Sequence, residues 1–361
     1  MGPSLPKARL AGAALAWALC VPALAARGAD HVDITWMSIA NLHLDFGTTR
    51  VLVDGYITRL PESLFFGGNG RLAHTRSASR PDEAAVRDVF EALGGRSAID
   101  LLITGHSHFD HSFDTPVWAR LSGGRLVGSA TTCLQARAAG IPARRCRTVA
   151  GGERIPLRDG VTMYVVRWNH SGDPVSDPEL HAPRELASPP VPDRQGRLHA
   201  GVVEDFPNGG GSRAYLFVLT TPGRPISLFF QDSAGAVDLD RPLVVDGHDF
   251  GAPLENLRRT LEQAGLDRVD LWVGTGGAEV ASLVLPILRP RAYLPVHWDG
   301  LFDPFKAGPP AAFADARLAS LLAANDVALI TPAQYMDKWR LDASGVHGLE
   351  NGAVKARLGF R

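Results

Sequence analysis

The sequence predicts an α+β fold in which two sheets face each other and helices cover their outer sides. Segments of alternating or continuous apolar residues, typical of strands, recur in both halves of the chain. Amphipathic segments of helical period follow these strands in each half, which suits two sheets that each carry their own helical layer. With 361 residues, of which 45% are hydrophobic and 21% charged, the chain is long enough to bury a sizeable core.

The N-terminal segment differs in composition from the rest of the chain. Lys7 and Arg9 precede an apolar run over residues 10–25 that ends in Ala-Leu-Ala, a pattern typical of a cleaved secretory signal. This run is interrupted by Pro22 and is shorter than the roughly 20 apolar residues that a membrane-spanning helix needs. We therefore expect residues 1–25 to be a signal peptide, the protein to be periplasmic or secreted, and the mature chain to contain no integral membrane span.

The first half of the chain predicts a meander of strands followed by alternating helices and strands. Residues 31–57 alternate or run apolar with a turn near Gly47, which is typical of antiparallel strands. Residues 81–93 begin with Pro and acidic residues and keep helical spacing up to Gly94, which predicts a helix. We further expect strands over residues 99–104, 125–127 and 161–168, and a helix around residues 132–139.

An irregular segment separates this half from the second. Residues 171–213 contain seven prolines and a Gly triplet, and a loop of this length is either functional, for example a lid, or a disordered surface segment. A hairpin is expected over residues 214–232, and then helices over 252–265 and 278–288 and strands over 269–274 and 291–298. The predicted domain spans residues 31–342 with 171–213 as an insertion, and residues 343–361 are expected to form a C-terminal tail.

Candidate metal ligands gather where the predicted strands end. The stretch HSHFDH follows the strand over residues 99–104, and three later strands also end in a histidine or an aspartate. Strand ends are where rigid scaffolds present functional groups. Imidazole suits zinc and iron, and a carboxylate can bridge two cations. These residue types therefore predict a metal site, with the candidate ligands His106, His108, Asp110, His111, His170, Asp232 and His297.

The motif HSHFDH is similar to the HxHxDH signature of the metallo-β-lactamase superfamily, and the later histidine, aspartate and histidine follow in that family's order. The resemblance covers most of residues 31–340. It implies a four-layered αβ/βα sandwich with a dinuclear metal site at one edge, between the sheets. Carried over position by position, it assigns His106, His108 and His170 to the first metal, Asp110, His111 and His297 to the second, and Asp232 to both as a bridge.

Other residues near the motif are expected to have lesser roles. Asp54 resembles the acidic residue that closes the family's early hairpin, and we expect it to support the site rather than bind metal. Gln231 departs from the family pattern, in which Gly commonly precedes the bridging aspartate. His181 and His199 lie in the insertion, where we expect solvated side chains.

The ligand set narrows the expected chemistry. His108 stands where flavin-linked diiron oxygen reductases of the superfamily carry Glu, which favours hydrolysis. Asp232 stands where the best known β-lactamases carry Cys, which favours a branch resembling lactonases and phospholipases of type D. The resemblance implies two divalent metal ions, Zn²⁺ with Mn²⁺ or Fe²⁺ as alternatives. A metal-bridging hydroxide would attack an ester, lactone or phosphodiester of a small-molecule substrate, with Asp110 orienting it or relaying the proton.

Two alternative functions stay open: a non-catalytic metal-binding or sensor protein of the same fold, and a β-lactamase-like amide hydrolase. Nucleic acid is not expected as a partner, because 37 basic and 38 acidic side chains nearly cancel and the sequence has no basic stripe. Cys133 and Cys146 form an even pair in the mature chain. They are either joined in an oxidising compartment or present as two buried thiols.

Overall fold

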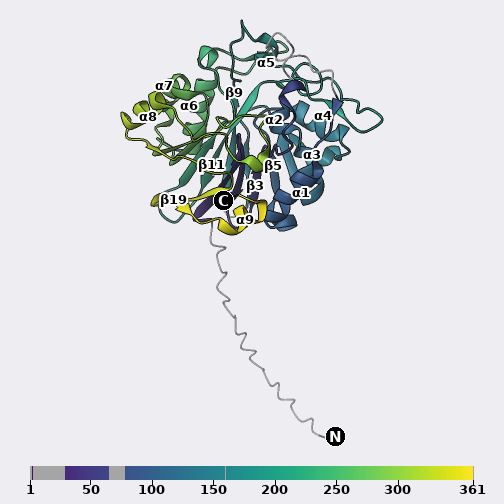
Figure 1. Ribbon diagram of the computed structural model, residues 1–361. Coiled ribbons are helices and arrows are strands. Elements are labelled where there is room, and N and C mark those ends of the chain that lie inside the picture. Colours follow the sequence, from purple (N-terminus) through teal and green to yellow (C-terminus); the bar gives the residue numbers. More distant parts are fainter. Residues whose placement is uncertain (1, 3–28, 65–77, 159, 361) are drawn as a thin grey trace.

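The computed structural model describes residues 2, 29–64, 78–158 and 160–360, so the expected signal peptide lies outside the described residues apart from Gly2. Two large sheets pack face to face within this part of the chain, with helices on their outer sides (Figure 1). The first sheet contains eight strands, in the spatial order β19 (Gly345–Leu349), β18 (Asp337–Asp342), β1 (His31–Ser38), β2 (Asn41–Asp45), β3 (Arg50–Val53), β5 (Leu101–Ile103), β6 (Arg125–Gly128) and β7 (Cys146–Thr148).

The second sheet contains seven strands, in the order β17 (Ala328–Leu329), β16 (Ala292–Pro295), β15 (Leu271–Gly274), β12 (Ile226–Phe230), β11 (Ser212–Leu219), β9 (Val161–Trp168) and β8 (Arg154–Pro156). Two short ladders pair β4 (Ala78–Ser79) with β10 (Leu198–His199) and β13 (Val244–Val245) with β14 (His248–Asp249). The expected meander is confirmed, because β1, β2 and β3 pair antiparallel in sequence order.

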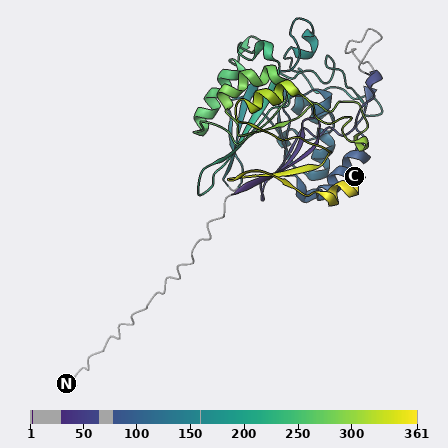
Figure 2. The same cartoon turned by 60° about the vertical axis from the view of Figure 1, so that its left-hand side comes forward.

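The helices form the two outer layers, seen on opposite sides of the sheets in Figures 1 and 2. Those beside the first sheet are α1 (Glu83–Ala92), α2 (Phe109–Ser112), α3 (Thr115–Ser122), α4 (Ala130–Ala138) and α9 (Gly352–Leu358). Those on the second sheet are α6 (Pro253–Ala264), α7 (Gly277–Leu288) and α8 (Ala316–Ala323), and the short α5 (Pro178–His181) lies in the insertion. None of the helices in the described ranges has the length and apolar character needed to span a bilayer.

Strand β11 shows how the second sheet is buried on both faces. Tyr215 and Phe217 belong to the core between the two sheets, whereas Leu216 and its neighbour Phe229 pack in a second core that includes Leu257 of α6. Successive strand side chains point to opposite faces, so a strand covered on both sides is apolar throughout. This explains why the segment that forms β11 reads as a continuous apolar run.

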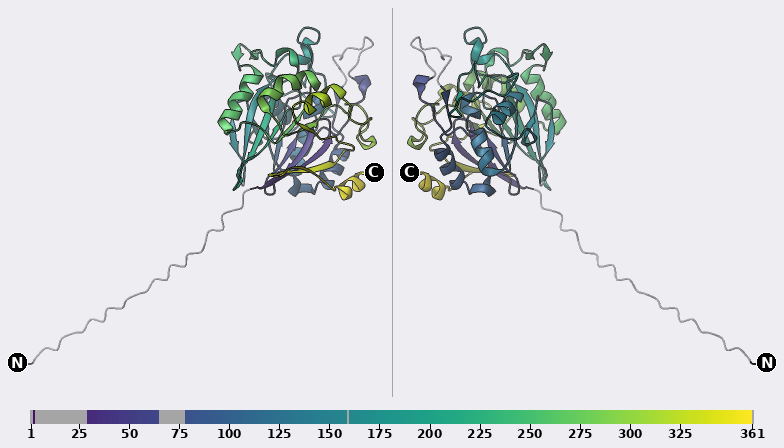
Figure 3. Two further views of the ribbon diagram at one scale, coloured as in Figure 1. Left: turned by 90° about the vertical axis from the view of Figure 1, so that its left-hand side faces the viewer. Right: turned by 90° about the vertical axis from the view of Figure 1, so that its right-hand side faces the viewer.

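The residues after 342 belong to the domain, so the predicted C-terminal tail is wrong. Strand β19 pairs antiparallel with β18, and Figure 3 shows the yellow α9 beside the blue helices of the first outer layer. Phe360 is buried, and its ring lies 5.4 Å from that of Phe305 and 5.9 Å from that of Tyr335. The segment that forms β19 contains two glycines and has no apolar alternation, so its strand depends on pairing with β18.

Residues 171–213 are ordered against the rest of the domain. Ser107 Oγ donates to the carbonyl of Pro207 at 2.6 Å and accepts from the backbone N–H of Gly209 at 2.8 Å. Glu185 accepts from both the backbone N–H and the hydroxyl of Thr131, at 2.8 and 2.6 Å. These contacts favour a covering segment over a disordered surface loop. The irregular part also ends earlier than predicted, because β11 begins at Ser212.

Candidate metal centre

The candidate ligands lie just past the ends of strands, as the sequence predicts. The HSHFDH motif begins three residues after β5 and continues into α2, for which His108 is the N-cap. His170, Asp232 and His297 each stand two residues after the last residue of a strand of the second sheet, respectively β9, β12 and β16. The two facing sheets therefore contribute ligands to one edge of the sandwich.

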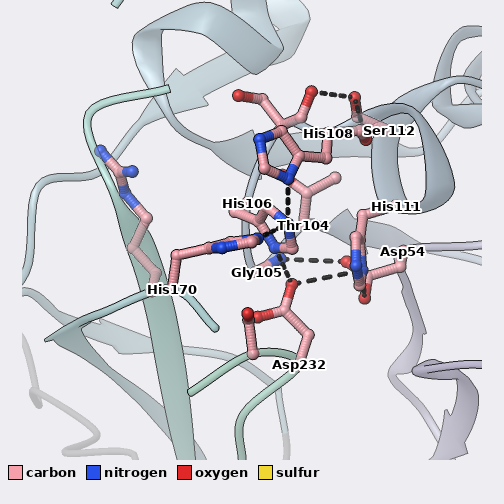
Figure 4. Close-up of polar contacts among 12 residues, drawn as sticks. Asp54, Thr104, Gly105, His106, His108, His111, Ser112, His170 and Asp232 are labelled. Carbon is pink, nitrogen blue, oxygen red and sulfur yellow. Dashed lines mark hydrogen bonds and ion pairs between the residues drawn. The ribbon is translucent and has the colours of Figure 1, made fainter. Parts of the chain in front are cut away.

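The first group of ligands is His106, His108 and His170. His106 Nε2 lies 3.1 Å from His108 Nδ1 and 3.1 Å from His170 Nε2, and all three side chains are buried. Figure 4 shows the three rings pointing toward one another, with His170 reaching in from the second sheet. Three imidazole nitrogens that converge in this way could hold a metal ion.

Hydrogen bonds on the far side of the rings determine which nitrogens are free to bind metal. His170 Nδ1 lies 2.7 Å from the carbonyl oxygen of Ser171, which can only accept, so Nδ1 carries the proton. His106 Nδ1 lies 2.7 Å from Asp232 Oδ2 and donates to that carboxylate. The Nε2 atoms of two neutral rings therefore face each other with bare lone pairs. Such an arrangement is stabilised by a cation between them.

The second group is Asp110, His111 and His297. Asp110 Oδ2 lies 3.1 Å from the Nε2 atom of each histidine, and the two Nε2 atoms are 3.2 Å apart. This group adjoins the first, because the rings of His106 and His111 have centroids 4.0 Å apart. Six of the seven candidate ligands thus lie in two adjacent groups of three, and the assignment of each group to one metal stays a prediction.

Asp232 touches one member of each group. Its Oδ2 lies 2.7 Å from Nδ1 of His106 and 3.3 Å from Nδ1 of His111, the nitrogens opposite those that converge (Figure 4). Its bridging role stays a prediction, since the contacts shown here are those of a hydrogen-bond acceptor that orients two ligands.

Asp54 has the supporting role that its position in the sequence predicts. It follows β3 with a positive φ of 58°, and its Oδ2 lies 2.9 Å from His111 Nδ1. Its Oδ1 accepts from the backbone N–H of Gly105 at 3.0 Å. Burial raises the pKa of Asp54 to about 7, against the opposing charge of His111. Asp54 therefore holds His111 through its Nδ1, on the side of the ring opposite the other members of the second group.

Burial and charge divide the ligands into neutral and charged members. Burial holds the pKa of His106, His108 and His170 well below the usual histidine value, so these rings are neutral. Burial also acts to lower the pKa of His111, but the surrounding carboxylates, Asp110 first, raise it well above that value. Without metal, His111 is therefore protonated and its positive charge is balanced by the surrounding carboxylates. A metal cation could take over this positive charge.

His181 supports the first group, so the predicted solvated side chain is wrong. His181 is buried, and its Nδ1 lies 3.2 Å from the carbonyl oxygen of Ser171, which also accepts a hydrogen bond from His170. Its Nε2 lies 2.7 Å from Asp238 Oδ2. Asn169 Nδ2 donates to the other oxygen of Asp238 at 2.5 Å. The sequence offered one signal for this network, the polar residues that flank His170, but nothing that linked them to residue 181.

One buried atom tests whether these residues fit a metal. Asp232 Oδ1 has no hydrogen-bond partner in the part of the chain that the structure describes. Buried polar atoms without partners are costly, and in native structures they often mark a bound group. Together with the converging lone pairs and the mixed imidazole and carboxylate donors, this atom fits divalent transition metals such as zinc.

No protein-family model matches the sequence. A curated relative, the UPF0173 metal-dependent hydrolase of Pyrobaculum arsenaticum, is 23% identical over 268 residues, which cover 74% of this chain and 84% of the relative. Igni18, a metallo hydrolase of Ignicoccus hospitalis, is 12% identical with a TM-score of 0.48 and covers 86% of this chain and 99% of its own. YhfI of Bacillus subtilis, a metallo-beta-lactamase fold protein, is 11% identical with a TM-score of 0.43 and covers 86% of this chain and 99% of its own.

The predicted fold class is confirmed by the architecture of the chain itself. Two facing sheets lie between two outer helical layers, and the ligand-bearing strand ends meet at one edge. The protein therefore has the metallo-β-lactamase fold.

Proposed function

We propose that the protein is a metal-dependent hydrolase that uses two divalent metal ions, one held by each group of ligands. The observation that carries this proposal is the convergence of the rings of His106, His108 and His170, with bare lone pairs on Nε2 of His106 and His170, directly beside the second group. The relative from Pyrobaculum arsenaticum, which is named a metal-dependent hydrolase, supports the reaction class.

The residues of this chain orient and polarise the ligands. When bound, divalent metal ions activate water and polarise the bond under attack. Asp232, Asp54 and the Ser171 carbonyl each hold an N–H of one ligand histidine, which fixes the ring and raises the basicity of the opposite nitrogen. The hydrogen bonds behind the ligands are thus as much part of the site as the ligands themselves.

Asp110 is the candidate proton acceptor. Burial acts to raise the pKa of Asp110, but His111 and His297 hold it well below the usual value, so the side chain is ionised at neutral pH. The side chain is 8% exposed, and its Oδ2 can accept a proton as well as bind a cation. We propose that it orients the attacking water or relays its proton.

The substrate class is an ester, lactone or phosphodiester of a small molecule. A histidine at position 108 supports hydrolysis over redox chemistry in the superfamily that the motif resembles, and an aspartate at position 232 supports the branch that resembles lactonases and phospholipases of type D over the β-lactamases. Zinc is the first choice of metal, because imidazole nitrogens dominate the donor set.

We also propose that the protein is exported to the periplasm or secreted. Cys133 and Cys146 form a disulfide that joins α4 to β7, with a Cα–Cα distance of 5.6 Å. Disulfides persist in oxidising compartments, which supports the signal expected over residues 1–25. Mass spectrometry of the protein from fractionated cells tests this. An intact N-terminus with two free thiols, recovered from the cytoplasmic fraction, contradicts export.

The function is tested with purified protein, elemental analysis and a panel of esters, lactones and phosphodiesters. We expect two equivalents of metal per chain and hydrolysis of at least one class. His170→Ala and Asp110→Ala should each lose metal and turnover, whereas His347→Ala, which changes an exposed histidine of β19, should retain both. Two bound metals without hydrolysis of any class would instead favour a metal-binding protein without turnover.

A further inference from the structure

A cavity of about 250 Å³ lies outside the metal centre, between β9, the loop before β8 and helix α6. Two arginines line it, Arg167 from β9 and Arg259 from α6, together with the polar side chains of Asn256, Thr260 and Gln263. None of its lining residues is acidic, and none is a candidate metal ligand. The cavity therefore presents two positive charges and several hydrogen-bonding groups without a negative charge of its own.

Arg167 is buried with part of its hydrogen-bonding capacity unused. It is 3% exposed, its guanidinium lies 4.0 Å from the ring centroid of Phe250, and its Nη1 donates to the carbonyl of Ala150 at 3.0 Å. Its Nε is buried and has no hydrogen-bond partner among the residues the structure describes. A buried N–H without an acceptor costs roughly 1–3 kcal/mol, more for a charged group. A ligand that accepts hydrogen bonds would remove this cost.

The acidic side chains near Arg167 already have other partners. Glu185 accepts from Thr131 and lies 3.6 Å from Arg213, which is itself buried. Glu153 accepts from the backbone N–H groups of Ala150 and Gly151, at 2.6 and 2.8 Å. Burial and the charge of Arg213 lower the pKa of Arg167 to about 9, which agrees with a guanidinium that lacks a carboxylate of its own.

Arg259 approaches the cavity from the solvent side. It is exposed, and its Nη2 donates to the side-chain oxygen of Asn256. No ion pair of Arg259 occurs within the described ranges, whereas its neighbour Arg258 pairs with Glu255 at 3.6 Å on the exposed side of the helix. Arg259 thus lines the cavity from an exposed position, whereas Arg167 lines it from a buried one.

We propose that this cavity binds a small oxyanion, the phosphate or carboxylate group of a metabolite, between Arg167 and Arg259. Guanidinium groups recognise both anions through paired N–H donors. The cavity is several times larger than the roughly 30 Å³ that one water molecule occupies in the liquid, so it has room for an anionic group that carries a small organic part. Arg167 lies in β9, the strand that His170 follows, so the occupant would contact the strand that leads to this candidate ligand.

The test compares two neighbouring arginines of α6 in the metal-loaded full-length protein. Inorganic phosphate is titrated by calorimetry at constant ionic strength into the wild type, Arg259→Gln and Arg258→Gln. Both variants lose one positive charge from the same helix, but only Arg259 lines the cavity. We expect wild type and Arg258→Gln to bind phosphate equally and Arg259→Gln to bind at least tenfold more weakly.

Equal phosphate binding in all three proteins would place the phosphate elsewhere, for example at the metal centre, and would exclude a phosphorylated ligand in this cavity. A parallel titration with acetate distinguishes the two ligand classes. If acetate, but not phosphate, shows the loss in Arg259→Gln, the natural ligand is a carboxylate; if phosphate shows it, the ligand is phosphorylated. If neither anion binds in a way that depends on Arg259, the cavity is not an anion site.

Discussion

A Cβ atom on Gly105 would lie 2.1 Å from Cγ of Asp232. The carboxylate of Asp232 thus occupies the space that any larger residue before His106 would fill. The backbone of Gly105 is also fixed, because its N–H donates to Asp54 Oδ1 at 3.0 Å and its carbonyl accepts from the N–H of Arg213 at 2.7 Å. Glycine is therefore required at this position by the carboxylate that orients two of the ligands.

Gly105→Ala should displace Asp232 and so release His106 from its hydrogen bond. We expect metal content to fall well below that of the wild type, and the free energy of unfolding to fall by about 1–3 kcal/mol, as for other overpacked sites. Elemental analysis and urea unfolding measure both effects. Gly348→Ala is the control, since a Cβ at Gly348 meets no atom within 4 Å. A Gly105→Ala protein with full metal content would show that metal binding does not require the observed position of the Asp232 carboxylate.

His181→Ala should weaken the first metal site without removing a ligand. The change removes an N–H that shares the Ser171 carbonyl with His170, and it leaves Asp238 without its imidazole partner. Loss of such a supporting contact lowers metal affinity roughly 10-fold or more. Competition with a chromophoric chelator measures the affinity. His199→Ala, which changes a side chain of the same insertion that is 42% exposed, should leave it unchanged. Equal affinities in the two variants would assign His181 a purely structural role.

The candidate ligands could be found in the sequence because their chemistry is rare and their positions are regular. His170 and His297 follow apolar strand segments at the same distance, and the HSHFDH motif follows another. The supporting residues could not be predicted in the same way. His181 lies in a segment without periodicity, and its burial depends on Asp238, which is 57 residues away in the chain. Long-range contacts of polar side chains leave no local pattern.

The C-terminal residues show the same limit in the fold. The long apolar and amphipathic segments were predicted close to their observed bounds, as for β9 over Val161–Trp168. The strand β19 and the short helix α9 were not, because β19 is weakly apolar and contains two glycines and α9 is only seven residues long. Their stability comes from pairing with β18 and from the burial of Leu358 and Phe360.

Phe360→Ala therefore tests whether the C-terminal residues are part of the folded domain. Phe360 is 6% exposed and packs its ring against Phe305 and Tyr335. Truncation of a buried phenylalanine costs about 3–5 kcal/mol, so we expect a loss of this order in the free energy of unfolding. Urea unfolding followed by tryptophan fluorescence measures it. Arg357→Ala, an exposed change in α9, is the control and should unfold like the wild type. If Phe360→Ala also unfolds like the wild type, the C-terminal residues do not contribute to the stability of the domain.

Asp114 should make the protein less stable as the pH rises from about 4 to about 6. Burial raises the pKa of Asp114 from 3.8 to about 6, against the hydrogen bonds that its carboxyl group accepts from Ile57 and Thr58. In this interval the folded protein keeps a proton that the unfolded chain releases, so the free energy of unfolding falls with pH, by roughly 3 kcal/mol in total.

Asp114→Asn stays neutral and still offers an oxygen to both N–H groups, so its stability should vary less over the same interval. Urea unfolding at several pH values, with a chelator present to remove metal release as a cause, compares wild type, Asp114→Asn and the exposed control Asp240→Asn. Parallel pH profiles for wild type and Asp114→Asn would show that Asp114 is ionised in the folded protein throughout this range.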